Sequence, residues 1–288
     1  SLTVGNSGMA CERLVDVTAK LQDSLGNATA SSAADSAKLD TSAPNGEAAP
    51  TVEITTDSNN DGFVNPTELG NATTFTVKGS FDKTKVAVGD KVIFSDANNN
   101  LSTVTLTQAM ITAGKATTTF PKPAEGAALT VAAIIQDAAL NVTAPSATDT
   151  ATLDSTAPTQ LVSFSSMTKD SGLASTTGVN ADWTTNDSSA GRQVSGFLSA
   201  ALGTNESVVV FVDKGDGNGP QPLGNGVTNG IATVAAGGTT WTITDVKDYG
   251  TSATWNYTAQ VLDAANNLGA LKTQSVTTAI EGLDEAEL

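Results

Sequence analysis

An internal repeat is the feature of this sequence that most constrains its fold. The segment from Leu21 to Pro44 (LQDSLGNATASSAADSAKLDTSAP) matches the segment from Ile135 to Pro158 (IQDAALNVTAPSATDTATLDSTAP) at 13 of 24 positions, 114 residues further along. A fainter third copy, VLDAANNLGALKTQSVTTAI, runs from Val261 to Ile280. Self-similarity of this kind predicts a folding unit that recurs along the chain.

Each copy has the same local design. An apolar run leads into D-x-x-x-N and a polar, alternating run follows, which predicts a strand, a tight turn and a second strand. The first two copies then end in L-D-[ST]-[ST]-A-P, a linker whose proline ends the last strand. The aspartates of the turns are predicted to hold them by side-chain to backbone bonds rather than to bind metal. The three pairs are Asp23 with Asn27, Asp137 with Asn141, and Asp263 with Asn267.

The linkers divide the chain into three predicted segments. Residues 1–49 hold the closing strands of a repeat and a linker, residues 50–158 form one sandwich, and residues 159–288 form a second. The second sandwich has a hairpin insertion near 215–230 and an acidic tail. Strands at 8–12-residue spacing with turn-formers between them predict β-sandwiches. The aromatic residues expected in the second core are Phe211, Trp241, Trp255 and Tyr257.

These features resemble the bacterial Ig-like repeats of large secreted surface adhesins, of the biofilm-associated and RTX type. The residues that carry the resemblance are the D-x-x-x-N turns, LDTSAP and LDSTAP, TTDSNNDGFVNPTEL, and TTND followed by VSGFLSAALGTNESVVVFVD. The resemblance implies an all-β fold of tandem Ig-like β-sandwich domains in an extended array. It also implies a structural and adhesive role in biofilms, on the bacterial cell surface. The long hairpin DKGDGNGPQPLGNGVTNG departs from the usual compact turn.

Composition excludes several classes of chemistry. The chain has no histidine and one cysteine, Cys11, so Ser-His-Asp catalysis, Cys-His catalysis, an ordinary zinc site and an internal disulfide are ruled out. We therefore expect no enzyme, although carboxylate-only glycosidase chemistry stays formally open. A net charge of −16 disfavours nucleic acid and anionic membranes and attracts cations. No apolar run reaches the roughly 18 residues of a membrane span.

The segment DSNNDGFVNPTE predicts a calcium site. It matches the calcium-loop pattern D-x-[DN]-x-[DN]-G-x5-E at every specified position, and nothing around it looks helical. The alternative is an Asn/Asp/Gly-rich hairpin loop that matches by chance. Gly62 would make the sharp turn, and the charge of the loop suggests a Kd on the order of 10⁻⁴–10⁻³ M. The expected donors are Asp57, Asn59, Asp61, the Phe63 carbonyl, Asn65 and bidentate Glu68.

Other acidic positions are weaker candidates for calcium. Asp213, Asp216 and Asn218 fall in the hairpin insertion, where a solvated turn is an equal alternative. The resemblance implies ligands between successive domains at Asp170, Asp182 and Asp187. Asp40 and Asp154, in the linkers, could complete such sites.

Three functional interpretations follow. Calcium-stiffened modules of an adhesin come first, with neighbouring repeats as partners and a surface glycan or protein receptor as the ligand. The second is a self-assembling filament or surface-layer subunit, because a lone hairpin in residues 1–49 is unstable and its strands could complete an identical subunit. The third is a glycan-binding module, which an exposed Trp183 would favour.

Overall fold

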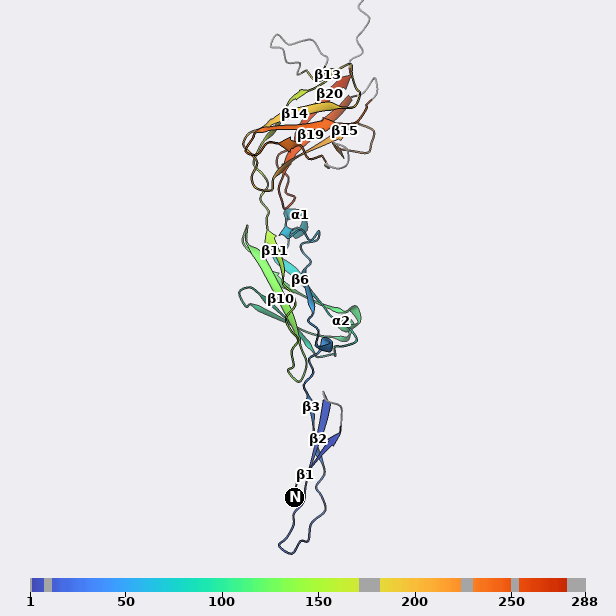
Figure 1. Cartoon of the computed structure of the whole chain (residues 1–288), viewed down its shortest axis with the longest axis vertical. Coiled ribbons are helices and arrows are strands. Elements are labelled where there is room, and N and C mark those ends of the chain that lie inside the picture. Colours follow the sequence, from blue (N-terminus) through green and yellow to red (C-terminus); the bar gives the residue numbers. More distant parts are fainter. Residues whose placement is uncertain (1, 8–11, 171–181, 224–229, 250–253, 279–288) are drawn as a thin grey trace, which may run out of the picture. The chain divides into compact units, whose positions relative to one another are not determined.

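The structure is a computed structural model that describes residues 2–7, 12–170, 182–223, 230–249 and 254–278. These residues are almost entirely β-strands and the turns between them, so the fold class is all-β, as predicted (Figure 1). They form two compact units, Ser1–Leu153 and Asp154–Leu288. The division falls inside the second L-D-S-T-A-P linker, so most of this linker belongs to the second unit.

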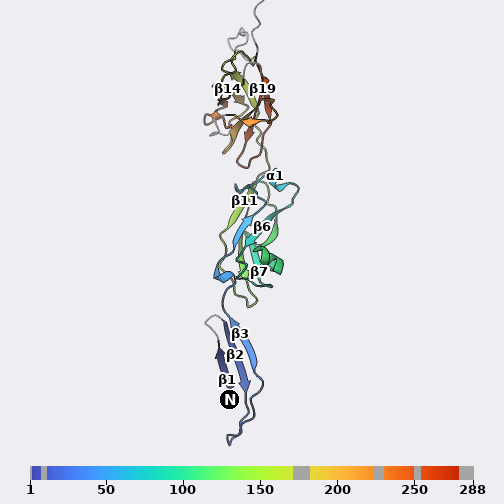
Figure 2. The same cartoon turned by 90° about the vertical axis from the view of Figure 1, so that its right-hand side faces the viewer.

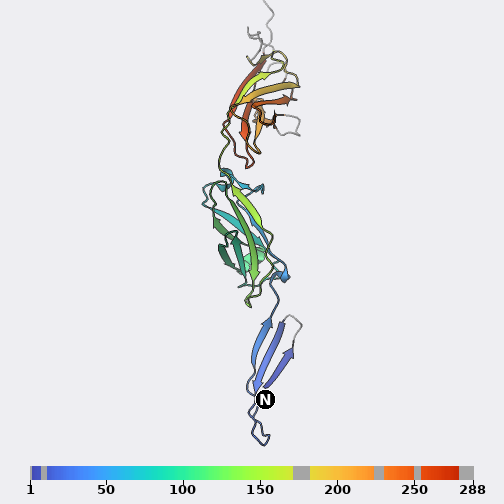
Figure 3. The same cartoon turned by 60° about the vertical axis from the view of Figure 1, so that its left-hand side comes forward.

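A three-stranded antiparallel sheet opens the first unit, with β2 between β1 and β3 (Figure 2). The strands are β1 Leu2–Ser7, β2 Glu12–Ala19 and β3 Asp35–Asp40. The sequence predicted two strands here, and β1 was missed because its glycine, asparagine and serine are poor strand formers. Figure 3 shows the three blue strands side by side in one layer.

A sandwich of two sheets forms the rest of the first unit. One sheet has the order β4–β6–β9, and the other has the order β5–β11–β10–β7–β8, with only the β5–β11 pair parallel. Three short helical turns are η1 Asn45–Glu47, α1 Pro66–Leu69 and α2 Gln108–Ala113. The strands are β4 Thr51–Ile54, β5 Phe63–Val64, β6 Thr74–Ser80, β7 Lys91–Asp96, β8 Leu101–Thr105, β9 Lys115–Pro121, β10 Ala128–Gln136 and β11 Asp149–Leu153.

Alternation along the strands builds this core. Every second residue of β6 and of β10 is buried, because successive side chains of a strand face opposite sides of its sheet. Phe75 and Val77 of β6 lie in one cluster with Phe94 of β7 and Ile135 of β10, and all four are fully buried. Burial of such a side chain contributes about 1.5–3 kcal/mol.

The second unit is a sandwich with a related plan. Its sheets have the orders β12–β14–β18–β17 and β13–β20–β19–β15–β16. The two-residue strand β13 pairs in parallel with β20, as β5 does with β11. The strands are β12 Val162–Met167, β13 Thr184–Thr185, β14 Arg192–Leu198, β15 Ser207–Asp213, β16 Gln221–Pro222, β17 Thr233–Val234, β18 Thr240–Asp245, β19 Thr254–Leu262 and β20 Lys272–Thr278.

Three of the four predicted core aromatics are fully buried in this unit: Trp241, Trp255 and Tyr257. The prediction for Phe211 was wrong, because the alternation of β15 places its neighbouring valines in the core and leaves Phe211 half-buried on the other face, opposite Pro222. At Gly196 on β14, a Cβ atom would lie 2.5 Å from the Trp241 ring, so only glycine fits there.

Trp183 is also part of this core. It is only 6% exposed and packs edge-on against Phe164, with ring centroids 5.9 Å apart. Trp183 therefore does not form the exposed aromatic platform that would favour glycan binding.

Candidate calcium loop and linker sites

The Asp57–Glu68 loop follows β4 in the first sandwich and ends in helix α1. Gly62 at its sharp turn has φ +88°, in the left-handed region that favours glycine. The expectation that nothing nearby is helical was wrong, since α1 is a single helical turn at the end of the loop. The sequence does contain the signal for the start of this helix. Asn65 is the N-cap, Pro66 is the first helical residue, and Glu68 completes a capping box.

Asp57 is the centre of the loop's hydrogen bonds. Its side chain is buried, and its two carboxylate oxygens accept the backbone N–H groups of Asp61 (3.1 Å) and Gly62 (2.9 Å). Asn59 Oδ1 also accepts the Asp61 N–H (3.0 Å), while Asn59 Nδ2 donates to Asp61 Oδ2 (2.9 Å). The structure thus brings three of the predicted calcium donors together at one turn.

Glu68 faces the same turn, but backbone groups occupy its oxygens. Glu68 Oε1 accepts the N–H groups of Ser58 (3.0 Å) and Asn59 (3.3 Å), and Oε2 accepts the N–H of Asn65 (3.2 Å). Asn65 Oδ1 caps α1 by accepting from Thr67 (2.9 Å) and Glu68 (3.1 Å). The N–H of Phe63 donates to Asp61 Oδ1 (2.9 Å).

The charges of the loop favour a cation. Burial raises the pKa of Asp57, and repulsion from Asp61 and Glu68 adds to this, against the lowering effect of its backbone hydrogen bonds. None of the ion pairs between described residues involves Asp57. Carboxylate and amide oxygens are also the ligands that calcium prefers.

The geometry does not form a ready-made metal site. Within the described part of the chain, no group of three or more His, Cys, Asp or Glu side chains is arranged to hold a metal ion. Glu68 would have to exchange its backbone hydrogen bonds for the metal. The donor types fit calcium, and binding at this loop stays a prediction.

The D-x-x-x-N turns hold the linkers as well as themselves. Asp137 Oδ1 accepts the backbone N–H of Asn141 (2.8 Å), which closes the turn as predicted. The Asn141 amide Nδ2 then donates both to Asp137 Oδ2 (2.9 Å) and to the carbonyl oxygen of Asp40 in the preceding linker (3.2 Å). The same contacts recur in the second unit, where Asn267 Nδ2 donates to Asp263 Oδ2 (2.9 Å) and to the Asp154 carbonyl (3.0 Å). We call these two contacts the linker latches.

Sequence reasoning missed one acidic residue near the first latch. Asp90 lies with Asp40, Asp137 and two lysines around a hollow of about 680 Å³. Its side chain is buried, and burial raises its pKa, with repulsion from Asp137 and Asp40 adding to the effect. No sequence pattern marks Asp90, because its partners are distant in the chain.

The predicted ligands Asp170, Asp182 and Asp187 each accept a backbone N–H of the protein itself. Asp170 accepts the N–H of Trp183 (3.3 Å), and Asp182 accepts that of Thr184 (3.0 Å). Asp187 accepts the N–H of Ser189 (3.0 Å) and forms an ion pair with Lys169 (3.5 Å). Hydrogen bonds from Ser189 lower the pKa of Asp187, and the charge of Lys169 contributes to this shift.

The residues of the hairpin insertion also bond locally. Asp213 accepts the N–H of Gly215 (2.8 Å), and Asp216 accepts that of Asn218 (3.0 Å). The Asn218 hydrogen bonds lower the pKa of Asp216, and the charge of Lys214 helps. These contacts describe two Asx turns, and they bring no further carboxylate toward either aspartate.

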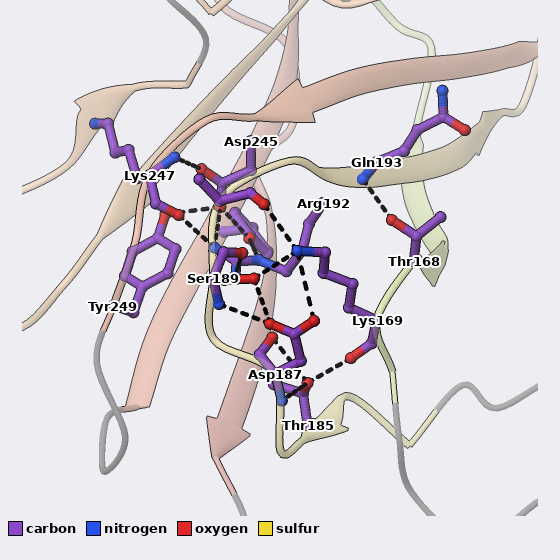
Figure 4. Close-up of polar contacts among 12 residues, drawn as sticks. Thr168, Lys169, Thr185, Asp187, Ser189, Arg192, Gln193, Asp245, Lys247 and Tyr249 are labelled. Carbon is purple, nitrogen blue, oxygen red and sulfur yellow. Dashed lines mark hydrogen bonds and ion pairs between the residues drawn. The ribbon is translucent and has the colours of Figure 1, made fainter.

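A buried ion pair that the sequence did not reveal lies in the second sandwich (Figure 4). Arg192 at the start of β14 and Asp245 at the end of β18 are fully buried, with Arg192 NH2 3.0 Å from Asp245 Oδ2. The hydroxyls of Tyr249 and Tyr257 donate to the same oxygen. Burial, with Asp245 nearby, raises the pKa of both tyrosines, so they stay protonated donors.

Aromatic rings and backbone oxygens complete this network. The Arg192 guanidinium lies 4.6 Å from the Tyr249 ring centre and 5.0 Å from that of Trp255, within cation–π range. It also donates to the carbonyls of Ser189 and Lys247. The buried pair is therefore well supplied with partners, which indicates a structural role.

No described helix is long and apolar enough to cross a membrane. No protein-family model matches the chain, and no curated protein matches it. Among solved structures, it is similar over 92% of its length to the chicken CNTN1 FN1–FN3 domains, at 12% identity, covering 77% of that chain with a TM-score of 0.44.

Two adhesion proteins are also similar over 92% of the chain. One is a 1.5-MDa bacterial ice-binding adhesin, at 19% identity, 74% coverage of that chain and a TM-score of 0.33. The other is a tetra-tandem repeat in the extending region of a large adhesion protein, at 20% identity, 56% coverage and a TM-score of 0.27. Since all three TM-scores are below 0.5, the fold class rests on the packed sheets of the chain itself.

Proposed function

We propose that this chain is a structural and adhesive segment of an extracellular, bacterial cell-surface protein, built from tandem Ig-like modules and without catalysis. The observation that carries the proposal is the pair of linker latches. In both, the asparagine of a turn in one module binds the linker aspartate that precedes that module. A repeated contact between a linker and the module that follows it suits an array whose purpose is to hold its modules in order.

Calcium is the proposed stiffening agent. At the buried Asp57, which Asp61 and Glu68 repel, a divalent cation would relieve unfavourable negative charge. Asn59, Asn65 and the Phe63 carbonyl would supply further oxygens. A bound ion would hold the loop between β4 and α1, and at about 100-fold over its Kd it would add roughly 2.7 kcal/mol to the stability of the fold.

An adhesive array also needs a ligand, and the charge of the chain limits which classes of ligand it can bind. The net charge of −16 disfavours nucleic acid and anionic lipid. A surface glycan or a protein receptor is the proposed adhesive ligand, and neighbouring repeats are the proposed structural partners.

Small-angle X-ray scattering tests the stiffening. The full chain is measured in millimolar calcium and in chelator, and we expect calcium to narrow the distribution of interatomic distances. The control is the Asp57→Asn, Asp61→Asn double variant, which should give the chelator profile in both conditions. Identical profiles for the natural chain in calcium and in chelator would exclude calcium stiffening.

A further inference from the structure

The strand pair β2–β3 repeats the strand pair β10–β11, the closing strands of the first sandwich. In β2 and β3, Val15 pairs with Ala37 and Val17 with Asp35. With the repeat offset of 114 residues, these are the Leu129–Ala151 and Val131–Asp149 pairs of β10 and β11. The register of the two strand pairs is therefore the same.

The side-chain bonds that follow the strand are also the same. The backbone N–H of Ala19 donates to Ser32 Oγ (3.0 Å) and that of Leu21 to Thr29 Oγ1 (3.1 Å). In the sandwich, Ala133 and Ile135 donate to Ser146 and Thr143 at 3.0 Å each. These side-chain bonds are therefore present both beside the three-stranded sheet and in the complete sandwich.

The β2–β3 pair differs from the β10–β11 pair in the exposure of its apolar face. Leu21 is 77% exposed, whereas its equivalent Ile135 is fully buried. Leu39 is 51% exposed, whereas its equivalent Leu153 is 3% exposed. In the sandwich this face is covered by the β4–β6–β9 sheet.

The apolar set of the exposed face matches the set that the β4–β6–β9 sheet covers. Four of six positions hold the same residue, and the other two exchange one aliphatic side chain for another, a change that cores tolerate. The six residues are Val15, Val17, Ala19, Leu21, Ala37 and Leu39, and their equivalents are Leu129, Val131, Ala133, Ile135, Ala151 and Leu153.

We propose that residues 14–39 are the closing half of a further Ig-like module, whose exposed face binds the opening half of a repeat. That partner is a three-stranded sheet of the β4–β6–β9 kind. It belongs to the same polypeptide, because both complete sandwiches take their two sheets from one chain. This inference deepens the proposed array and rests on it for the nature of the partner.

An independent contact agrees with this partner. Asn27 Nδ2 donates to Asp23 Oδ2 (2.9 Å), and the described residues offer it no second acceptor. The equivalent Asn141 and Asn267 use their second N–H on a linker aspartate. An opening half that begins with an L-D-[ST]-[ST]-A-P linker would bring this missing acceptor to Asn27, together with the covering sheet.

The test compares the natural chain with a chimera. In the chimera, residues 40–127 are fused in front of Leu14 in place of residues 1–13, so that the chain's own opening half precedes the exposed strands. Both proteins carry Leu21→Cys, and Cys11, the one natural cysteine, is removed by Cys11→Ser in the natural chain and by the fusion in the chimera. The rate of thiol labelling and the mass from light scattering are measured.

We expect a monomeric natural chain that labels quickly at position 21, and a chimera that labels ~100-fold more slowly, because a folded sandwich exposes this face only when it opens. The matched control is Leu25→Cys, on the turn, where the equivalent Ala139 is exposed even in the complete sandwich. It should label quickly in both proteins.

Two results would overturn the proposal. One is equally fast labelling at position 21 in the chimera, which would show that the opening half does not cover the face. The other is a natural chain that is oligomeric and protected at position 21, which would show that a second copy covers it. Labelling and light scattering are both measured in chelator, so calcium binding at the Asp57–Glu68 loop contributes to neither result and failure of the stiffening proposal is distinguishable.

Discussion

Asp57 illustrates how one carboxylate can carry two roles. Its oxygens accept two backbone N–H groups, so it shapes the loop without any metal. Its burial also raises its pKa, with Asp61 and Glu68 adding repulsion, so the folded loop holds charge that a cation would neutralise. Removing Asp57 therefore affects the calcium response and the loop itself, and only a comparison with and without calcium separates the two.

For Asp57→Asn, we expect the calcium-induced stabilisation of the first sandwich to disappear. The natural chain should gain roughly 2.7 kcal/mol at calcium about 100-fold over its Kd, whereas the variant lacks the most buried donor. Calorimetry in calcium and in chelator measures the difference. Asp96→Asn is the matched control, because Asp96 closes a D-x-x-x-N turn of the same unit outside the loop, and it should keep the full calcium response.

The Arg192–Asp245 pair gives a second prediction at this scale. Asp245→Asn leaves the Arg192 charge buried without its counter-ion, so we expect a loss of about 3–5 kcal/mol in urea unfolding of the second unit. Arg192→Met with Asp245→Leu removes both charges and should lose less. Glu53→Gln, which breaks the half-exposed pair with Lys78 in the first unit, should cost under about 1 kcal/mol. A double variant as unstable as Asp245→Asn alone would contradict this explanation.

Asp90 makes the stability of the first unit depend on pH. Burial, with repulsion from Asp137 and Asp40, raises its folded pKa above the ordinary 3.8, so the folded state binds the proton more tightly than the unfolded chain. Its contribution to stability therefore falls as pH rises through the raised pKa. When the pH is lowered from about 7 to about 3, protonation of Asp90 should therefore favour the folded state of the natural chain. The Asp90→Asn variant lacks this contribution, so its melting temperature should rise less, or fall more, than that of the natural chain. Asp82→Asn should shift this difference the opposite way, because hydrogen bonds from Thr84 lower the pKa of Asp82.

At the scale of elements, the sequence predicted what depends on local pattern. The alternation of β6 and β10 and the D-x-x-x-N turns lie where expected, because period two and Asx bonding are decided within a few residues. The two-residue parallel strand β5 was missed, since its existence depends on β11, far along the chain. The linker latches were missed for the same reason: Asn141 and Asp40 are 101 residues apart.

The candidate site divides in the same way. The loop pattern predicted which oxygens gather near Asp57. The same residues also contain the sequence of a capping box, Asn65 followed three residues later by Glu68, and this helix signal was missed. The Arg192 network could not be predicted, because a single arginine at the start of a strand carries no signal without its distant partners.

The second latch can be tested at this scale. Asn267→Ala removes the bonds to Asp154, so we expect faster proteolysis within residues 154–158 than in the natural chain. Asn100→Ala is the matched control, since Asn100 makes the same bonds to Asp96 within its turn and, among the described residues, makes no hydrogen bond to a linker. Both variants lose the turn bond, worth about 0.5–1.5 kcal/mol, and only the first should free the linker. Equal cleavage in the two variants would count against the latch.

At the scale of the whole molecule, the described residues form two separate hydrophobic cores. The buried cluster of the first unit runs from Ile54 to Leu153, that of the second runs from Val162 to Val276, and no residue belongs to both. Because cooperative unfolding follows a shared core, each unit should unfold by itself. The sequence offers a reporter that separates them: all three tryptophans, at positions 183, 241 and 255, lie in the second unit.

We therefore expect two transitions in calorimetry, of which only one coincides with the change in tryptophan fluorescence. Chelation should lower the midpoint of the other transition, because Asp57 and its loop lie in the unit without tryptophan. The fluorescence midpoint serves as an internal control in the same sample and should not move. A single transition would show that the two cores unfold together, and a calcium-dependent fluorescence midpoint would place the dominant calcium site in the second unit. In that case the residues to substitute first would be the predicted acidic ligands of that unit, namely Asp154, Asp170, Asp182, Asp187, Asp213 and Asp216.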